Sequence, residues 1–422
     1  MYQLDWVEQL KLRTRQIPDS GPASAVSPAV WKLGWTSFLT DISSEMLNSV
    51  IPVYVVLHLH MSPMRYGTID GIYNGLAVAL LSLAAGLAAD RGRNHKDVAA
   101  VGYGLSALCK IALLFVGGVW TAIIATLALD RFGKGIRTAP RDALISLHTS
   151  NRAILATAFA AHRTMDAGGM LLGPSLAFTL LWFLPGAFDV VWITSFAFAV
   201  LGFATLTLFV PRPKYPRHLS ENESSLLAGL RLFRSRRFSL LALCGFGLSF
   251  MTISDGFLYL QLQKKSGADT TFFPLFYVLT AGSYMVASVP AGRVADKFGR
   301  FPMFLFGYLV LSALYFALLR TSELDSGALV AFVLTLGVYY AATEGILMAL
   351  ASDIVPQELR STGLAIVATA VGLGKVGSSL LFGYAWEMFG ATTAVWWFGW
   401  GLIISVGAAA TLLGLRSYAP ES

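Results

Sequence analysis

The chain has few of the residues that build disulfide, metal or catalytic centres. Its 422 residues include two cysteines and six histidines, and only 13% are charged. Both cysteines, Cys109 and Cys244, lie in apolar stretches, where we expect reduced core residues rather than a disulfide or metal framework. The sequence also has no phosphate-binding Gly-x-x-x-x-Gly-Lys-Ser/Thr loop and no Gly-x-Ser-x-Gly nucleophile motif. These absences argue against an enzyme, a metal site and a bound cofactor.

What the chain has instead is long apolar runs. Apolar residues make up 55% of the sequence and the mean hydropathy is +0.64, which is more than a soluble protein of this length can bury in one core. A membrane-spanning helix needs about 20 mainly apolar residues. The sequence therefore predicts an all-α membrane protein with twelve transmembrane helices, at 30–57, 67–89, 97–117, 119–141, 155–182, 188–210, 238–262, 271–292, 301–319, 327–350, 361–385 and 391–415.

The formal net charge of +7 fits a membrane topology better than a nucleic-acid partner. With the N-terminus in the cytoplasm, most of the 31 lysines and arginines fall in cytoplasmic loops and tails, and those on the other side are Arg65, Lys264, Lys265 and Arg320. This is the positive-inside bias. We therefore expect a multi-pass protein of the plasma membrane, such as a bacterial inner membrane, in contact with the lipid bilayer and with both termini cytoplasmic.

Two versions of one short motif lie about half the chain apart. Gly86-Leu-Ala-Ala-Asp90-Arg91-Gly-Arg93 follows the second apolar segment, and Gly292-Arg-Val-Ala-Asp296-Lys-Phe-Gly299-Arg300 follows the eighth. A half-length repeat in an apolar chain is typical of secondary transporters. The sequence divides into an N-terminal segment, a six-helix bundle, a proline-containing cytoplasmic linker, a second six-helix bundle and a tail, at 1–29, 30–210, 211–237, 238–416 and 417–422.

Two six-helix halves with a Gly-x-x-x-Asp-x-x-Gly-Arg pattern after helices two and eight resemble the major facilitator superfamily along nearly the whole chain. The second copy fits in full, and the first is one residue short between Asp90 and Arg93. The resemblance implies two pseudo-symmetric bundles and a conformational latch at the cytoplasmic rim. The glycines would let helices approach closely, and the aspartates can meet a helix N-terminus or a basic partner. The implied latch residues are Gly86, Asp90, Arg91, Arg93, Gly292, Asp296, Gly299 and Arg300.

The fourth predicted helix carries a run of basic residues. Its Leu127 to Ala139 stretch is similar to the superfamily motif L-x-x-x-R-x-x-q-G-x-g of mostly proton-coupled members, with Lys134 and Arg137 replacing an amide and a small residue. By spacing, these two residues share one broad helix sector with Arg131 and Arg141. Arg131 is placed near mid-membrane, where a charge costs at least a few kcal/mol without a partner or a watery cavity. We expect it to serve in proton coupling or in a structural ion pair.

The first predicted helix offers partners for this arginine. Asp41, Glu45, Asn48 and Pro52 form a polar stripe through an apolar segment. Burial disfavours the charged form of a carboxyl group and a nearby arginine favours it, so a carboxyl group on this stripe can load and release a proton. We expect Asp41, Glu45 and Arg131 to couple transport to protons. The alternative is a permanent ion pair of Arg131 with Asp41 or Glu45.

The fifth predicted helix contains Gly169-Met-Leu-Leu-Gly173-Pro174, which resembles the Gly-x-x-x-Gly-Pro motif of antiporting drug exporters. Small residues four apart permit close helix contact, and Pro174 can bend the segment. Other charged or titratable residues can extend a charge network, although for His162 a helix-packing role is favoured over a proton relay. The predicted network comprises Arg137, His162, Arg163, Asp166 and Lys375.

In the superfamily, helices one, four, seven and ten line a central cavity. The resemblance therefore implies a substrate cavity formed by Asn48, Lys134, Asp255, Tyr259, Tyr340 and Glu344. Glu344 and Lys375 sit on neighbouring segments of the expected fold, and a structural pair between them is an alternative.

Together these patterns predict a monomeric secondary active transporter of the twelve-helix drug/proton antiporter group. The Gly169 to Pro174 motif and the acidic stripe favour proton-driven export of a small amphiphilic or cationic organic compound. The basic fourth helix favours a second hypothesis, proton-coupled transport of an organic anion or metabolite. A non-transporting membrane receptor is a third. The sequence identifies neither the substrate nor the direction of transport.

Overall fold

The computed structural model describes residues 26–73, 94–149, 154–213, 231–320, 323–356 and 359–414. The described parts are helical, and their helices follow the order of the predicted twelve, with the second seen only in its first turns. The N-terminal half holds α2 (Pro28–Pro52) with the π-helix η2 (Val53–His58), α3 (Pro63–Gly71), α5 (His95–Ala112), α6 (Trp120–Leu147), α7 (Leu155–Phe183), and α8 (Phe188–Ala204) with the π-helix η5 (Thr205–Phe209).

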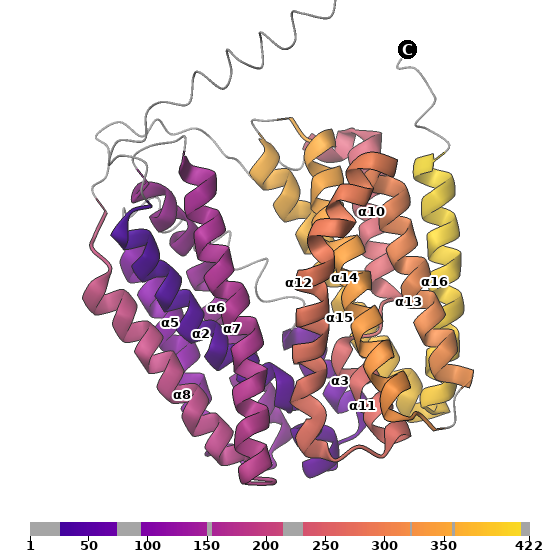
Figure 1. Ribbon diagram of the computed structural model, residues 1–422, viewed down its shortest axis with the longest axis horizontal. Coiled ribbons are helices and arrows are strands. Elements are labelled where there is room, and N and C mark those ends of the chain that lie inside the picture. The colour runs from indigo at the N-terminus through magenta and orange to yellow at the C-terminus, as the bar shows by residue number, and fades with distance from the viewer. Residues whose placement is uncertain are drawn as a thin grey trace, which may run out of the picture.

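The C-terminal half begins with short η6 (Arg231–Arg234) and contains another short helix, η7 (Thr270–Phe272). Its longer helices are α10 (Arg236–Phe250), α11 (Asp255–Ser266), α12 (Phe273–Phe298), α13 (Arg300–Arg320), α14 (Ser326–Ile354), α15 (Arg360–Phe389) and α16 (Ala391–Gly414). Figure 1 shows the two halves as separate bundles, with the N-terminal one in indigo to magenta and the C-terminal one in red to yellow. Seven helical segments of the described chain, from α8 onward, are long and apolar enough to cross a membrane.

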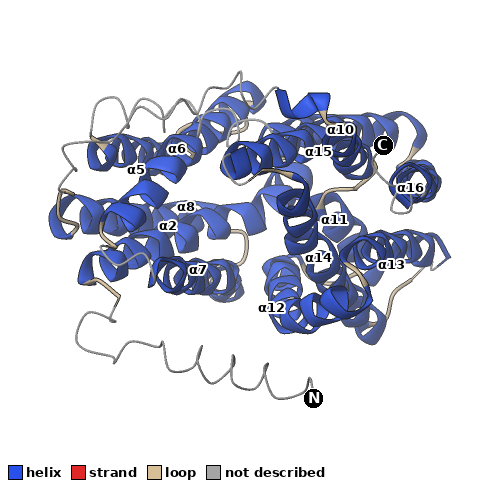
Figure 2. Ribbon diagram, turned by 90° about the horizontal axis from the view of Figure 1, so that it is seen from above, coloured by secondary structure: helices blue, strands red, loops and turns tan. Residues whose placement is uncertain are grey.

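The two bundles meet at one end of the molecule and diverge toward the other (Figure 1). We call the end where α2 begins and α16 ends the terminal end, and the opposite end the closed end. At the closed end α3 packs against α15 of the other bundle. Nearby, Phe178 and Trp182 of α7 contact Phe272, with ring centroids 5.8 and 5.5 Å apart. Figure 2 looks down on the bundles and shows α7 beside α12 and α2 inside the N-terminal bundle.

The membrane-spanning segment predicted at 238–262 is present, but its helix is interrupted between α10 and α11. Ser254 has an extended backbone at the N-cap of α11, and Asp255 in the first turn is stabilised by the partial positive charge of the helix N-terminus. The Ile253 N–H donates to the Tyr315 hydroxyl at 2.7 Å, and the Thr252 carbonyl accepts from Ser378. Neighbouring helices thus satisfy the backbone groups that the break releases.

The second copy of the predicted latch ends α12 and begins α13. Gly299 has φ 105°, a conformation that glycine adopts without a Cβ clash. The Arg300 guanidinium pairs with Asp353 of α14 at 2.7 Å and with Asp296 at 3.4 Å. Gly292 does not allow close helix approach within the described part of the chain, contrary to expectation, since a Cβ at this position would meet none of its atoms within 4 Å. Gly86, Asp90, Arg91 and Arg93 lie outside the described residues.

Candidate functional site

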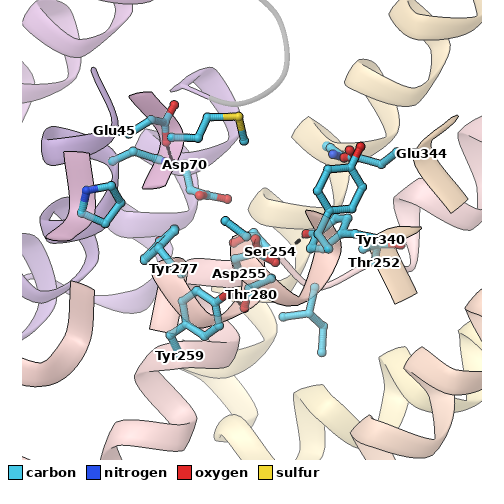
Figure 3. A pocket seen from close by; sticks show the side chains of 18 of the residues that line it. Glu45, Asp70, Thr252, Ser254, Asp255, Tyr259, Tyr277, Thr280, Tyr340 and Glu344 are labelled. Carbon is cyan, nitrogen blue, oxygen red and sulfur yellow. Dashed lines mark hydrogen bonds between the residues drawn. The ribbon is translucent and has the colours of Figure 1, made fainter. Parts of the chain in front are cut away.

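A cavity of about 260 Å³ lies where the two bundles meet. Its wall combines α2, α3 and α7 of one bundle with α11, α12, α14 and α15 of the other (Figure 3). Four carboxyl groups line it, from Glu45, Asp70, Asp255 and Glu344, together with the ammonium group of Lys375. Among the described lining residues, acidic groups therefore outnumber basic ones on a surface that both bundles share.

Hydrogen bonds orient three of these carboxyl groups. Asn48 donates to Glu45 at 3.0 Å, and the Tyr340 hydroxyl donates to Asp255 at 2.6 Å. Asp70 accepts from Ser379 of the opposite bundle at 2.5 Å. Partly desolvated carboxylates held in fixed positions favour a positively charged ligand, because a cation replaces the lost hydration with a direct charge interaction.

Tyrosine rings complete the cavity wall. Tyr259, Tyr277, Tyr284 and Tyr340 all contribute to the lining, and the Tyr259 hydroxyl is hydrogen-bonded to Thr280 at 2.6 Å. Aromatic faces attract organic cations through the ring quadrupole and also contact apolar groups. The break before α11 brings Ser254 to the wall as well, and its buried hydroxyl has no hydrogen-bond partner among the described residues.

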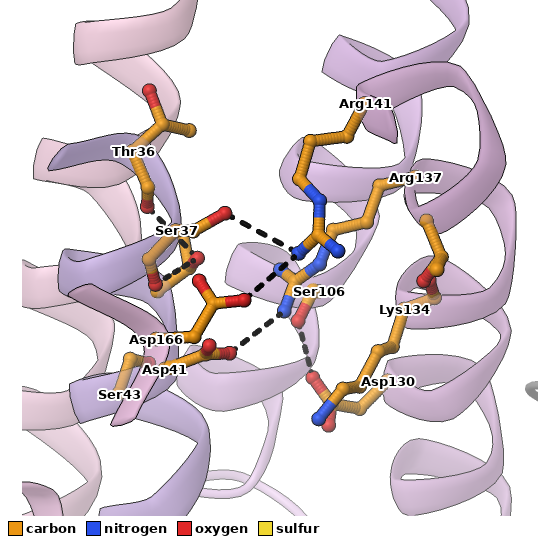
Figure 4. A network of polar contacts seen from close by, with 12 residues as sticks. Thr36, Ser37, Asp41, Ser43, Ser106, Asp130, Lys134, Arg137, Arg141 and Asp166 are labelled. Carbon is orange, nitrogen blue, oxygen red and sulfur yellow. Dashed lines mark hydrogen bonds and ion pairs between the residues drawn. The ribbon is translucent and has the colours of Figure 1, made fainter. Parts of the chain in front are cut away.

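A second polar cluster lies inside the N-terminal bundle, between α2, α6 and α7 (Figure 4). Arg137 approaches Asp41 at 3.9 Å and lies over the ring of Tyr103, 4.5 Å from the ring centroid. Arg141 approaches Asp166 at 3.9 Å and donates to the Ser37 hydroxyl at 3.3 Å. Two basic residues of α6, Arg137 and Arg141, therefore face aspartates of their own bundle.

Between α5 and α6 lies a buried ion pair. The Lys110 ammonium contacts Asp130 at 2.6 Å, and both side chains are at most 2% exposed. The Ser106 hydroxyl donates to the same carboxylate at 2.5 Å. Close backbone approach makes this possible, since a Cβ at Gly102 would lie 2.6 Å from the Gly133 carbonyl oxygen.

Comparison with known proteins gives the family. The Major Facilitator Superfamily model matches residues 33–379. The chain belongs to the Major Facilitator Superfamily. It is 30% identical over 375 residues to an uncharacterized MFS-type transporter of Methanocaldococcus jannaschii, covering 86% of this chain and 89% of the relative. The chain is thus a multi-pass secondary transporter of a small molecule and not an enzyme.

Solved structures of other superfamily members share the fold. The nucleoside transporter NupG has a TM-score of 0.77 at 14% identity, over 91% of this chain and 99% of that one. A POT peptide transporter has a TM-score of 0.76 at 13% identity, over 93% and 94% of the two chains. Proteins with different substrates share this architecture, so the substrate must be argued from the side chains of this superfamily member.

The predicted cavity residues of this superfamily member divide into two groups. Asn48, Asp255, Tyr259, Tyr340 and Glu344 line the cavity. Lys134 is not among the lining residues and lies on α6 among the cluster residues of Figure 4. Residues predicted for other roles also line the cavity, namely Glu45, Pro174 and Lys375. No ion pair joins Glu344 to Lys375 in the described chain, so the alternative of a structural pair is not observed there.

Several polar residues were not predicted. Asp70, Tyr277 and Tyr284 line the cavity, and Lys110 and Asp130 form the buried pair. An ionisable residue inside an apolar segment is itself a signal of function or pairing, and Asp70, Lys110 and Asp130 all carry that signal. The two tyrosines carry no such signal, because tyrosine is common both in helices with a functional role and in helices without one.

The alternative hypothesis, a permanent ion pair of Arg131 with Asp41 or Glu45, is wrong for the described residues. The Arg131 guanidinium lies over the Tyr73 ring, 3.3 Å from its centroid, and its Nε is 3.9 Å from Asp130. Asp41 instead faces Arg137. Arg131 is 5% exposed, and its Nε and Nη2 have no hydrogen-bond partner among the described residues.

His162 and Asp166 join α7 to the cluster, whereas Arg163 does not. His162 is buried, with Nε2 2.9 Å from the Ser37 hydroxyl and Nδ1 3.4 Å from Asp166. These contacts tie α7 to α2, which agrees with the favoured packing role. Arg163 is exposed and forms no ion pair within the described ranges.

The glycine motif of α7 brings that helix against the acidic stripe of α2. A Cβ at Gly169 would lie 2.9 Å from the Cβ of Asp41, and one at Gly173 would lie 2.7 Å from the Ile42 carbonyl oxygen and 2.9 Å from the Cβ of Glu45. The close contact expected from the spacing is present. It holds Asp41 and Glu45 at fixed positions along α7.

Proposed function

We propose that this transporter exports small organic cations or cationic amphiphiles in exchange for protons, by alternating access. The observation that carries the proposal is the cavity, where four carboxyl groups and one ammonium group are arranged with four tyrosines. A cation gains from the carboxylates and the aromatic faces together, and an apolar body fits against the rings. Carboxyl groups can also accept protons, so one set of residues can bind cation and proton in turn.

For coupling we propose Glu45, Asp41 and Arg131. Glu45 lines the cavity, so a proton and a substrate cation compete for its carboxylate. Asp41 lies one helical turn from Glu45 and next to Arg137 of the cluster. A change in the charge of Asp41 therefore changes its electrostatic interaction with α6. Arg131 supplies a buried positive charge that Asp130 only partly offsets at 3.9 Å.

The organic-anion hypothesis has less support. It rested on the basic residues of α6, and none of Arg131, Lys134, Arg137 and Arg141 lines the cavity. Three of them lie within 4 Å of an aspartate of the N-terminal bundle. Among the described lining residues, Lys375 is the basic one that an anion in the cavity could use, and it shares the wall with four carboxyl groups.

For the direction we propose export along the space between the two bundles. They meet at the closed end, and the positive-inside charge pattern predicts that the terminal end faces the cytoplasm. A substrate would then enter the cavity from the cytoplasm and leave after the closed end opens. We propose a monomer in the plasma membrane with both termini cytoplasmic.

The test uses purified protein in liposomes with radiolabelled tetraphenylphosphonium as the probe. Valinomycin with equal potassium on both sides clamps the membrane potential, so that the permeant cation responds only to an imposed proton gradient. We expect the probe to accumulate on the acidic side and nigericin to abolish this. Protein-free liposomes are the control. Accumulation of p-aminohippurate instead, with no response of the cation, would support the organic-anion hypothesis.

A further inference from the structure

Asp70 joins the cavity to the contact between the bundles. It lies near the end of α3, is 5% exposed and lines the cavity. One carboxylate oxygen accepts from the Tyr66 hydroxyl of the same helix at 3.3 Å, and the other accepts from the Ser379 hydroxyl of α15 at 2.5 Å. The same carboxylate therefore faces the ligand space (Figure 3) and also bridges the two bundles.

The helices around this bridge touch through their backbones. A Cβ at Gly67 would overlap the Ser379 carbonyl oxygen, and one at Gly383 would lie 2.7 Å from the Pro63 carbonyl oxygen. Farther along the same contact, the Met64 N–H donates to Glu387 of α15 at 3.0 Å. Among the described residues, the closed end is thus shut by tight backbone contacts, by the aromatic contacts of Phe272 and by a few polar bonds, and the Asp70 bond lies at the cavity wall.

The charged groups around Asp70 favour a cation as the competing ligand. Asp255 of α11 and Tyr277 of α12 interact electrostatically with Asp70 across the bundle contact. Glu45 of α2 and Lys375 of α15 line the same cavity. Because carboxyl groups predominate here, a positive group entering the cavity is drawn toward them, and Asp70 can exchange a hydroxyl donor for a charged partner.

We propose that Asp70 is a substrate-binding residue of the gate at the closed end. An organic cation in the cavity competes with the Ser379 hydroxyl for the Asp70 carboxylate, and loss of that bond releases α3 from α15. The inference rests on the proposed function in taking a cation as the ligand. It adds the residue through which substrate opens the far side of the transporter.

The resting gate can be tested with spin labels at Gly118→Cys and Glu323→Cys, two exposed closed-end positions on opposite bundles. Distance distributions are measured in lipid nanodiscs by electron resonance. Ser379→Ala should raise the ratio of open to closed gate about tenfold without ligand, the size expected for losing one hydrogen bond to a charged group. Ser312→Ala is the matched control, because that buried hydroxyl donates to the Tyr308 carbonyl within α13 and its loss should leave the distances unchanged.

The ligand response is tested with tetraphenylphosphonium. In the unaltered chain the probe should shift the distances toward the open gate. Asp70→Asn should abolish this shift and weaken probe binding about tenfold, since one charged contact is lost. Asp255→Asn is the matched control: its partner Tyr340 lies in the same bundle, so binding should weaken while bound probe still opens the gate.

The inference is overturned if Ser379→Ala leaves the distances unchanged or if Asp70→Asn responds to the probe as the unaltered chain does. Failure of the proposed function looks different. Proton gradients would then drive no probe flux, while the probe would still open the gate in the unaltered chain and not in Asp70→Asn.

Discussion

At the scale of the residue, the polar stripe of α2 contributes side chains to both the cavity and the polar cluster. Helical periodicity places Asp41 and Glu45 on the same side of α2, and that much follows from their spacing. Only the packing of other helices separates them. Glu45 reaches the cavity beside Asn48, whereas Asp41 faces Arg137 in the cluster.

We predict that Asp41→Asn or Glu45→Gln abolishes gradient-driven transport while the protein still folds and exchanges substrate. Each change removes a carboxyl group that can carry the coupled proton and keeps the side chain nearly the same size. Proton-driven flux and substrate counterflow in liposomes separate coupling from binding. Asp142→Asn is the control, since that carboxylate is 45% exposed and pairs with Arg141 outside the cavity. Normal pH-dependent flux in both variants would exclude both residues as the coupling site.

A second prediction concerns the buried pair. Asp130→Asn should destabilise the protein by about 3–5 kcal/mol, the usual cost of breaking a buried ion pair, because it leaves Lys110 and Arg131 both without their carboxylate. Lys110→Met should cost less, because Asp130 retains Arg131. Thermal unfolding in detergent ranks the two variants. A larger loss for Lys110→Met would contradict this account of the charge balance.

At the scale of the element, apolar length predicts that a helix exists but not where it is interrupted. The run through 238–262 is apolar on both sides of the break, so its hydropathy does not indicate where the helix is interrupted. Ser254 followed by Asp255 is a helix-start pattern in the sequence, yet such pairs also occur within helices. The break is decided by partners from distant segments, Tyr315 and Ser378, which the local sequence does not name.

The contact of α7 with α2 gives a third prediction. Gly173→Ala should lower transport strongly and destabilise the protein by about 1–3 kcal/mol, because the added methyl group meets the backbone of α2 at 2.7 Å. Gly168→Ala is the matched control, since its added methyl group would meet only the movable edge of the Phe38 ring, at 3.3 Å. Flux at equal expression and melting temperature are measured together. Equal effects of the two changes would show that the α2 contact is not critical.

At the scale of the whole molecule, composition and the repeated motif predict the twelve-helix fold and its two halves. Five of the six cavity residues implied by the family resemblance do line the cavity. Lys134 shows the limit of this prediction, because it lies on a helix expected to line the cavity but belongs to the polar cluster of the N-terminal bundle. Residues such as Asp70 depend on how α3 meets α15, a contact between distant parts of the chain that spacing along one helix does not reveal.

A fourth prediction belongs to this scale. Asp296→Asn should change the ratio of inward-open to outward-open molecules by up to about tenfold, without eliminating substrate binding. The reason is that losing a contact which forms in one state destabilises only that state. Spin labels on the two bundles at the terminal end report the ratio. Asp97→Asn, which removes the exposed partner of Arg212, is the control. Unchanged distances with reduced transport would assign Asp296 to folding or to the substrate path.

The buried pair of Lys110 and Asp130 also has a consequence for biosynthesis. These residues lie on consecutive helices, and neither α5 nor α6 is among the described segments apolar enough to span a membrane. A lysine or an aspartate alone at mid-membrane opposes insertion by about 2.5–3.5 kcal/mol, whereas a neutralised pair does not carry both costs. We therefore expect α5 and α6 to enter the lipid together, as a helical hairpin.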